Sequence, residues 1–335
     1  MKPALPTLLI LCVLANASLA EEKPNSEVER IDSQFDKLVP KNAKVELLAG
    51  GFKWTEGPVW IKRGGYLLFS DIPNNRINKW KEGEGISVFL DRSGYTGSEP
   101  FTGEEPGTNG LVLDAKGRLT MCEHGSRRVS RLNSDGSRTI LAAKYQGKRF
   151  NSPNDLIWHA SGDLYFTDPP YGLPKRYDDP QRELDWCGVY RRSVDGKITL
   201  VSKRLRRPNG IALSPDQKTL YVAQSDGSEA IYVAFPIKSD GSLDEGKILF
   251  DATKRIGKEG RPGGPDGMAV DVHGNLWATG PGGVLVITPD GKLLGRVGTG
   301  ERTANCCFGG DGSTLYMASD DYLTRIKTTT RGLGF

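Results

Sequence analysis

The chain has 335 residues, of which 37% are hydrophobic and 26% are charged, a composition typical of a folded globular protein. Its formal net charge is +4, and acidic and basic residues are interspersed without a basic block, which argues against a nucleic-acid partner. The 42 glycines are spread along the chain, which indicates many tight turns and excludes a single low-complexity tail.

The first twenty residues predict an export signal. Lys2 is followed by an apolar run, and the stretch ends in the small-residue pattern Ser18-Leu19-Ala20, as in a secretory signal peptide cleaved after Ala20. The apolar run is short for a segment that spans a bilayer. We therefore expect residues 21–335 to be exported, to a periplasm or beyond, without a membrane anchor.

Residues 21–44 form a polar segment whose apolar side chains follow a helix-like spacing, at Val28, Ile31, Phe35 and Leu38. This spacing predicts a short segment packed on the outside of the main domain, which we place at residues 45–335. Four cysteines lie in that domain without CxxC spacing, so buried free thiols are expected, with one disulfide as the alternative in an oxidising compartment: Cys122, Cys187, Cys306 and Cys307.

One hairpin pattern recurs along the main domain. A polar residue precedes a short apolar run, a turn and a second apolar run, as in "PNDLIWHASGDLYFTD" (153–168) and "PNGIALSPDQKTLYVAQSD" (208–226). Six such units begin near residues 55, 108, 153, 208, 265 and 304, and each is followed by further strand-like sequence. Four strands at this period predict an all-β, six-bladed β-propeller, and the six matching hairpins disfavour a β-sandwich.

The ends of a propeller must join, because an unpaired strand edge is a liability. We expect residues 40–53 to add a strand to the last blade, beside "YLTRIKTT".

Aligning the six units places one polar residue at the start of each innermost strand, where the strands approach the propeller axis. We call these six the axial residues: Glu56, Asn109, Asn154, Asn209, Asp266 and Asn305. Asn and Asp also favour turns. However, oxygen-bearing side chains fill all six places, and glutamate has no turn preference, which together favour a shared site.

Oxygen ligands converging on one point suit a hard cation, and two carboxylates match a divalent charge. The sequence therefore predicts a central metal site holding one divalent cation, with Ca²⁺ as the first choice. Mg²⁺, Mn²⁺ and Zn²⁺ are the alternatives, although zinc usually takes His or Cys ligands.

The second strand of each hairpin ends near the axial residues. Four side chains there have predicted roles. Asp71, Glu123 and Asp168 are expected to orient metal ligands or bound water. His124 is either a proton carrier or a solvent-facing turn residue.

The segments "EGPVW", "FSDIPNNRI", "CEHGSRRVSRL", "RFNSPNDLIW", "YFTDPPYGL", "RPNGIALSPD" and "GPDGMAVD", in this order, resemble the gluconolactonase / senescence marker protein / luciferin-regenerating enzyme-like family. The resemblance covers residues 45–325. It implies a six-bladed propeller with a divalent metal on its axis and hydrolysis of a sugar lactone, such as gluconolactone, to the aldonic acid.

Carried over by motif, the resemblance implies four metal ligands: Glu56, Asn154, Asn209 and Asp266. Asp266 is also the family's usual candidate for the catalytic base, and His124 is our second candidate because a metal-bound carboxylate is a weak base. In some relatives the residue matching Asn154 binds substrate instead.

Two further residues are assigned to the substrate, Arg149 and Asn109. Some relatives have a lactone-binding Arg two residues before Asn154. Ser152 stands there in this chain, and Arg149 is the nearby replacement. Two long inserts, at 91–108 and 171–188, are expected to select the substrate.

The predicted function is that of a gluconolactonase-type hydrolase of carboxylic ester bonds with a small-molecule substrate. The alternatives are a metal-dependent esterase or phosphotriesterase of the same architecture, or a non-catalytic propeller that binds a sugar or a protein.

Overall fold

The computed structural model describes residues 21–23 and 25–335, so the predicted export signal lies outside the described residues. The described chain is almost entirely β-structure with three short 3-10 helices, η1 (Ser33–Lys37), η2 (Arg176–Asp178) and η3 (Thr253–Arg255). None of the described helices has the length and apolar character needed to cross a bilayer.

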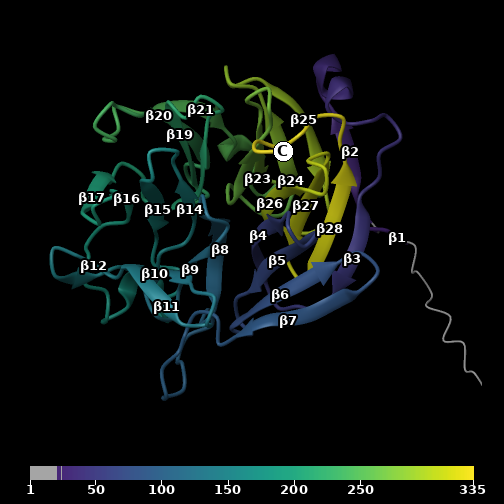
Figure 1. Ribbon diagram of the computed structural model, residues 1–335. Helices are drawn as coiled ribbons and strands as arrows, with labels where there is room; N and C mark the ends of the chain where they lie inside the picture. Colours follow the sequence, from purple (N-terminus) through teal and green to yellow (C-terminus); the bar gives the residue numbers. More distant parts are fainter. Residues whose placement is uncertain (1–20, 24) are drawn as a thin grey trace, which may run out of the picture.

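Six antiparallel sheets follow one another along the chain, which confirms the predicted six-bladed propeller (Figure 1). We number the blades by their innermost strands. Blade 1 contains β4 (Thr55–Ile61), β5 (Tyr66–Asp71), β6 (Arg76–Lys81) and β7 (Gly85–Asp91). Blade 2 contains β8 (Thr108–Leu113), β9 (Leu119–Glu123), β10 (Arg128–Leu132) and β11 (Arg138–Ala142). Blade 3 contains β14 (Leu156–Trp158), β15 (Leu164–Asp168), β16 (Gly188–Arg192) and β17 (Ile198–Ser202).

The other three blades repeat the same order. Blade 4 contains β18 (Pro208–Leu213), β19 (Thr219–Gln224), β20 (Ile231–Pro236) and β21 (Lys247–Asp251). Blade 5 contains β22 (Met268–Val270), β23 (Leu276–Gly280), β24 (Gly283–Ile287) and β25 (Leu293–Gly298), and blade 6 begins with β26 (Thr303–Gly309), β27 (Thr314–Ser319) and β28 (Tyr322–Lys327). A small hairpin, β12 (Lys144–Tyr145) with β13 (Lys148–Arg149), links blades 2 and 3.

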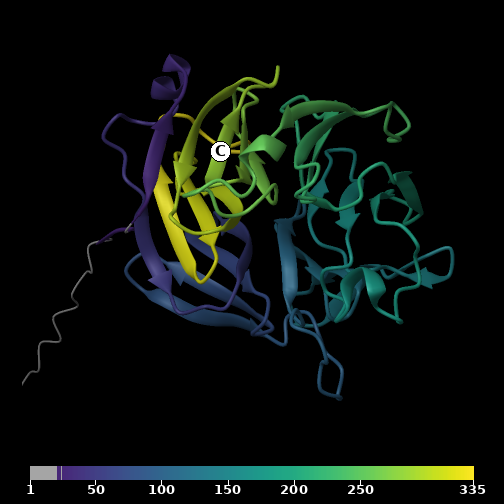
Figure 2. The ribbon, with the colours of Figure 1, turned by 180° about the vertical axis from the view of Figure 1, so that it is seen from behind.

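The N-terminal part of the chain completes the last blade. β3 (Glu46–Gly50) pairs antiparallel with β28, which confirms the strand predicted within residues 40–53. Figure 1 shows the purple β3 beside the yellow β28, and Figure 2 shows the same pairing from behind. The two ends of the propeller are therefore joined by ladder hydrogen bonds, which removes an exposed edge.

The segment before β3 is mostly strand, although the spacing of its apolar residues is helix-like. β1 (Glu21–Glu22) pairs with β3, and β2 (Glu27–Arg30) adds a fifth strand to blade 5 by pairing with β25. Helical conformation is limited to η1, from which Phe35 packs into the hydrophobic cluster between blades 5 and 6. An available sheet edge thus overrides the local spacing, because pairing satisfies the backbone groups of both strands.

The hydrophobic core is divided among the blade interfaces. Each of the six buried clusters draws its side chains from two neighbouring blades, because the central strands are buried on both faces. In every blade the pairing of the third strand with its outer neighbour shifts register once. Such bulges increase strand twist. The four described cysteines are free thiols, and the predicted alternative of a disulfide is not found among them.

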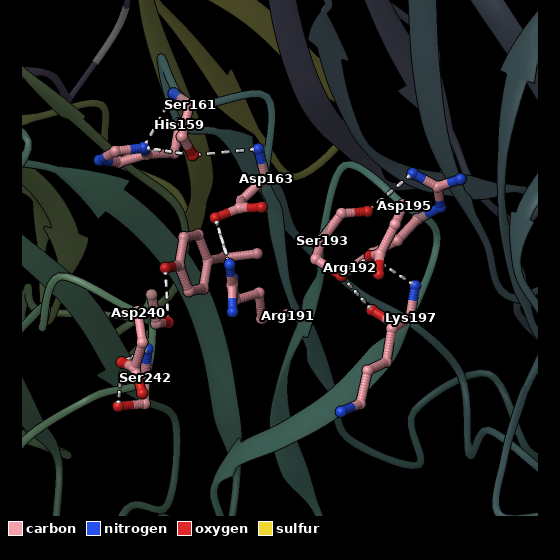
Figure 3. Close-up of polar contacts among 12 residues, drawn as sticks. His159, Ser161, Asp163, Arg191, Arg192, Ser193, Asp195, Lys197, Asp240 and Ser242 are labelled. Carbon is pink, nitrogen blue, oxygen red and sulfur yellow. Dashed lines mark hydrogen bonds and ion pairs between the residues drawn. The ribbon is translucent and has the colours of Figure 1, made fainter.

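Polar turns close the blades at the end opposite to the axial residues. In Figure 3, Arg191 points to Asp163, and its Nε donates to Asp163 Oδ2 at 2.9 Å. Ser242 donates to Asp240 Oδ1 at 2.6 Å in the neighbouring turn of blade 4. These hydrogen bonds set the local geometry at this end of the blades.

Replacement of Phe35 with alanine should destabilise the protein by about 3–5 kcal/mol, because it opens a cavity where a fully buried ring now packs. The free energy of unfolding in urea measures this loss. Ile31→Ala is the matched control, since Ile31 is 46% exposed, and it should change stability by less than about 0.5 kcal/mol. Equal effects of the two substitutions would show that η1 contributes nothing to the core.

Glu29 fastens β2 to blade 5 and should make stability depend on acid pH. It accepts hydrogen bonds from Arg261 at 2.9 and 3.0 Å and from Arg296 at 2.8 Å. Its hydrogen bond to Arg261 is the main cause that lowers the pKa of Glu29 from 4.5 to about 2. A lowered pKa contributes stability above the ordinary value, and this contribution is lost as pH falls from 4.5 towards 2.

Glu29→Gln should therefore lower the melting temperature at neutral pH, and the difference from wild type should shrink as pH falls below about 4. Thermal unfolding of both proteins across this range measures the difference. Glu259→Gln, at an exposed position, is the control and should match wild type throughout. A difference in melting temperature between wild type and Glu29→Gln that does not vary with pH would contradict the lowered pKa of Glu29.

Candidate active site

The six axial residues lie where the innermost strands begin. Glu56, Asn109, Asn209 and Asn305 belong to β4, β8, β18 and β26, whereas Asn154 and Asp266 lie two residues before β14 and β22. Five of them are at most 7% exposed, and Asp266 is partly exposed as a residue. In all six blades a polar residue therefore stands at the start of the innermost strand or two residues before it, as predicted.

Irregular pairing turns these side chains out of the ladder. The first two strands shift register at Glu56, after Thr108, after Pro208 and before Asn305. A bulge of this kind re-aims a side chain, and bulges are common beside active sites. In blades 3 and 5 the axial residue instead precedes the regular strand.

Close contacts link each axial position to the next. A side chain at Gly57, which has φ +50°, would lie 2.1 Å from the carbonyl oxygen of Asn109. The same approach recurs at Gly210, where a side chain would lie 2.1 Å from the carbonyl oxygen of Asp266. Glycine is required at such positions because the neighbouring backbone occupies the place of a Cβ.

Hydrogen bonds join further axial residues into a circle around the axis, which we call the axial circle. Gly110 N donates to the Asn154 carbonyl at 2.8 Å, and Asn305 Nδ2 donates to Glu56 Oε2 at 3.0 Å. Asp155 spans the gap between blades 3 and 4, since its Oδ2 accepts from Ile211 N at 3.2 Å. The six axial residues therefore lie side by side around the axis, as the repeat alignment predicted.

Three oxygens of this circle have no hydrogen-bond partner although they are buried. They are Asn109 Oδ1, Asn209 Oδ1 and Asp266 Oδ1. An unpaired buried acceptor costs free energy, so native proteins rarely leave one, and three together indicate a site for a cation or for donor groups. A cation at the axis, together with the hydroxyl donors of a bound substrate, would satisfy these oxygens.

The raised pKa values of the buried carboxyls around the axis also favour a cation there. Burial raises the pKa of Glu56 and of Asp266, and the charge of each nearby carboxylate raises them further. Burial also raises the pKa of Asp155 to about 7. Without a compensating charge these carboxyls resist ionisation, whereas a divalent cation would favour the ionised forms.

The donor set fits a hard cation better than a transition metal. Among the described residues, no group of three or more His, Cys, Asp or Glu side chains is arranged to hold a metal. A cation at the axis would therefore depend on the carboxamide oxygens of Asn as much as on the carboxylates, and this mixture suits calcium more than zinc.

His124 is fully buried, with no exposed surface. Its Nδ1 lies 2.9 Å from Glu105 Oε2, and its Nε2 is buried without a partner. The structure therefore does not support the alternative of a solvent-facing turn residue.

Asp168 and Asp71 hold backbone near the axial end. Asp168 accepts from Asn151 N at 2.9 Å and from Ser152 N at 2.8 Å, so it shapes the segment that leads to Asn154. Asp71 accepts from Lys53 N at 3.2 Å, just before β4. Both act on the approach to an axial residue and contact no axial side chain.

The Glu123 side chain is bound inside its own blade. Its carboxylate is bound within blade 2, by Arg128 at 2.6 Å and by Arg138 at 3.0 Å. Two arginines of the outer strands of its own blade thus bind the carboxylate of Glu123, and its role in orienting metal ligands or bound water stays a prediction. The alternation of side chains along β9 places it on the face opposite to its neighbour His124.

Arg149 lies at the rim of a pocket of about 330 Å³. The pocket is formed between the two long inserts and includes Tyr95, Phe101 and Leu173. Arg149 Nε donates to Glu183, which also accepts from Arg149 N at 2.7 Å, and 47% of the side chain is exposed. Its guanidinium can reach a ligand in the pocket, but none of its hydrogen bonds is to an axial residue.

Three residues at the axial end were not predicted. Asp155 follows Asn154 at a position where four other blades have glycine, and this difference was a usable signal. Glu105 reaches His124 from the first insert. Tyr171, from the second insert, contacts Ser225 with its hydroxyl. The two loop residues had no local signal, because only the course of the loops brings them to the axis.

Comparison with known proteins identifies relatives of this chain. The chain is 38% identical over 312 residues to a gluconolactonase from Zymomonas mobilis, covering 91% of this chain and 87% of that protein. It is 26% identical over 272 residues to a pentonolactonase from Haloferax volcanii, covering 79% and 80%. A solved gluconolactonase from Xanthomonas campestris superposes with a TM-score of 0.79 at 32% identity, covering 93% of this chain and 98% of that chain.

A luciferin-regenerating enzyme shares the fold, with a TM-score of 0.65 at 19% identity, covering 88% and 96%. The family described as SMP-30/Gluconolactonase/LRE-like region matches residues 54–321, which include all six axial residues. The chain therefore belongs to the SMP-30/gluconolactonase/LRE-like family.

Proposed function

We propose that this protein hydrolyses a sugar lactone of the gluconolactone type to the aldonic acid, with a divalent cation held by the axial residues. The observation that carries the proposal is the closed circle of buried oxygens, three of which lack a partner. The names of its relatives, gluconolactonase and pentonolactonase, support a lactone as the substrate.

Glu56, Asn154, Asn209 and Asp266 would hold the cation, with Ca²⁺ as the first choice. When bound, such a cation acts as a Lewis acid toward the lactone carbonyl and stabilises the negative charge that develops on its oxygen. The carboxamides of Asn109 and Asn154 can bind the sugar hydroxyls, and Arg149 can bind the outer part of the substrate from the pocket rim.

The reaction itself needs one proton acceptor. A water attacks the carbonyl carbon and gives up a proton to Asp266 or His124. The new carbon–oxygen bond forms first and gives a tetrahedral species. Its collapse breaks the ester bond of the lactone, and the leaving oxygen takes the proton to become a hydroxyl. The product is the open-chain acid, so no further reactant is required.

A substrate panel tests the proposal. The purified protein should hydrolyse aldonolactones at least about tenfold faster than aryl esters or phosphotriesters, and a chelator should abolish this activity until Ca²⁺ is restored. Preference for an ester or a phosphotriester would favour the alternative enzymes, and binding without turnover would favour a non-catalytic propeller. Either outcome contradicts lactone hydrolysis as the main function.

We also propose that the protein is exported after cleavage at Ala20, as the composition of residues 1–20 indicates. N-terminal sequencing of the protein recovered from its producing cells should begin at Glu21. A mature protein that retains Met1 or Lys2 contradicts this.

A further inference from the structure

Glu105 and His124 form a hydrogen-bonded pair at the axial end. Glu105 Oε2 lies 2.9 Å from His124 Nδ1, and the Glu105 side chain is 24% exposed while His124 is fully buried. Glu105 belongs to the first insert, whereas His124 directly follows β9 of blade 2. The pair therefore joins a loop to the rigid scaffold.

The backbone and the second insert hold His124 in place from other sides. His124 N donates to the Gly107 carbonyl at 3.1 Å. Gly172 packs so closely that a Cβ there would lie 2.6 Å from His124 Cβ. The imidazole is thus confined, and only its Nε2 lacks a partner.

The partner of Nδ1 decides which nitrogen carries the hydrogen. An ionised carboxylate can only accept, so Nδ1 must donate to Glu105, and in the neutral imidazole Nε2 is then a bare acceptor. A buried acceptor without a protein partner is a place for a water molecule.

Glu105 also lies within electrostatic reach of the axial residues, since its charge contributes to the raised pKa of Glu56 and of Asp266. Gly172 packs against both His124 and Ser152, since a Cβ there would lie 2.6 Å from His124 Cβ and 2.9 Å from Ser152 Cβ. The pair therefore lies beside the segment that leads to Asn154, although no hydrogen bond joins it to an axial residue. The neighbouring Glu104 is exposed.

We propose that Glu105 is a positioning residue that holds His124 with its hydrogen on Nδ1, so that the bare Nε2 accepts the proton of the attacking water. This inference rests on the proposed function and assigns the proton acceptor within it. The proton passes from water to Nε2 and then to the leaving oxygen of the opened lactone, while the hydrogen on Nδ1 stays shared with Glu105. The Glu105 carboxylate, hydrogen-bonded to Nδ1, stabilises the cationic imidazole between these two transfers.

The second histidine of the described chain supplies an internal reference with the opposite arrangement. His159 Nδ1 accepts from Ser161 N at 3.0 Å, so its hydrogen must lie on Nε2, which is 3.2 Å from the Gln217 carbonyl. Figure 3 shows His159 beside Ser161 in the exposed turn of blade 3. The chain has only three histidines, and the third, His273, is exposed.

Nitrogen NMR of the full-length mature protein labelled at histidine tests the geometry without an activity assay. In wild type, His124 should show hydrogen on Nδ1 and a bare Nε2, and His159 the reverse. In Glu105→Ala, His124 should lose this preference while His159 is unchanged. A wild-type His124 with hydrogen on Nε2, or a His124 signal that Glu105→Ala does not alter, would overturn the proposal.

Kinetics test the consequence. Glu105→Ala should lower kcat by about 100-fold and change KM by less than about twofold, because general-base assistance acts on the chemical step. Glu105→Gln keeps an accepting oxygen but removes the charge, so it should lose about tenfold. Glu104→Gln is the matched control and should retain the wild-type kcat.

The proposed function and the proposed role of Glu105 can be contradicted independently of each other. If wild type hydrolyses no lactone, the proposed function is wrong, whereas the NMR result still decides the state of His124. If wild type is active and Glu105→Ala keeps the wild-type kcat, with or without a change in KM, then Glu105 does not position the proton acceptor and the inference is overturned.

Discussion

Asp266→Asn is expected to lower kcat/KM for a sugar lactone by about 1000-fold or more. Asp266 is one of two carboxylates in the axial circle, and its Oδ1 is buried without a partner. Asparagine keeps the shape of the side chain but removes its charge, so a cation would be held less tightly and the negative charge of the transition state would be less stabilised. Steady-state kinetics with gluconolactone measure the loss.

Asp178→Asn is the control, since Asp178 is an exposed aspartate on the second insert, in η2. It should keep wild-type kinetics, and the circular dichroism of both variants should match wild type. A fall of less than about tenfold in Asp266→Asn would show that this carboxylate is dispensable, and the site would have to be placed elsewhere.

Removal of divalent cations should lower the melting temperature by several degrees. A cation bound only by the folded protein, at 100 times its Kd, adds about 2.7 kcal/mol of stability. The effect should be larger here than for a surface site, because burial and like charge raise the pKa of Glu56 and Asp266 in its absence. Thermal unfolding with chelator, and after restoring Ca²⁺, measures the difference.

Asp266→Asn supplies the comparison for this second experiment. The variant lacks one of the two repelling carboxyls, so without cation it should be at least as stable as wild type, and Ca²⁺ should raise its melting temperature much less. An identical response of wild type and variant to Ca²⁺ would place the cation outside the axial circle. No response of wild type to chelator or to added cation would contradict a structural cation altogether.

The repeat made the fold and the positions of the six axial residues predictable from sequence. Each blade is built from neighbouring segments, so its strands, turn and axial residue are encoded locally and appear six times. The closing strand β3 was predictable for a related reason, since a propeller with an unpaired last blade would expose an edge. The glycines after Glu56 and Asn209 were visible too, although their close contacts were not.

The remaining features depend on contacts between distant segments. β2 looked helical, but the free edge of β25 made it a strand. Glu123 looked equivalent to the other residues at the ends of the second strands, yet Arg128 and Arg138 bind it within its own blade. Nothing in the composition of the first insert distinguishes Glu105 from Glu104.

The sequence by itself determined the six-bladed architecture and the ring of oxygen-bearing side chains, because periodic local patterns specify strands and bring equivalent positions to one axis. Only the tertiary structure decided which polar groups remain unpaired and which loop residue meets His124. The reason is physical: hydrogen-bond partners are chosen by distance, and the course of a long loop is set by its packing against other blades rather than by its own residues.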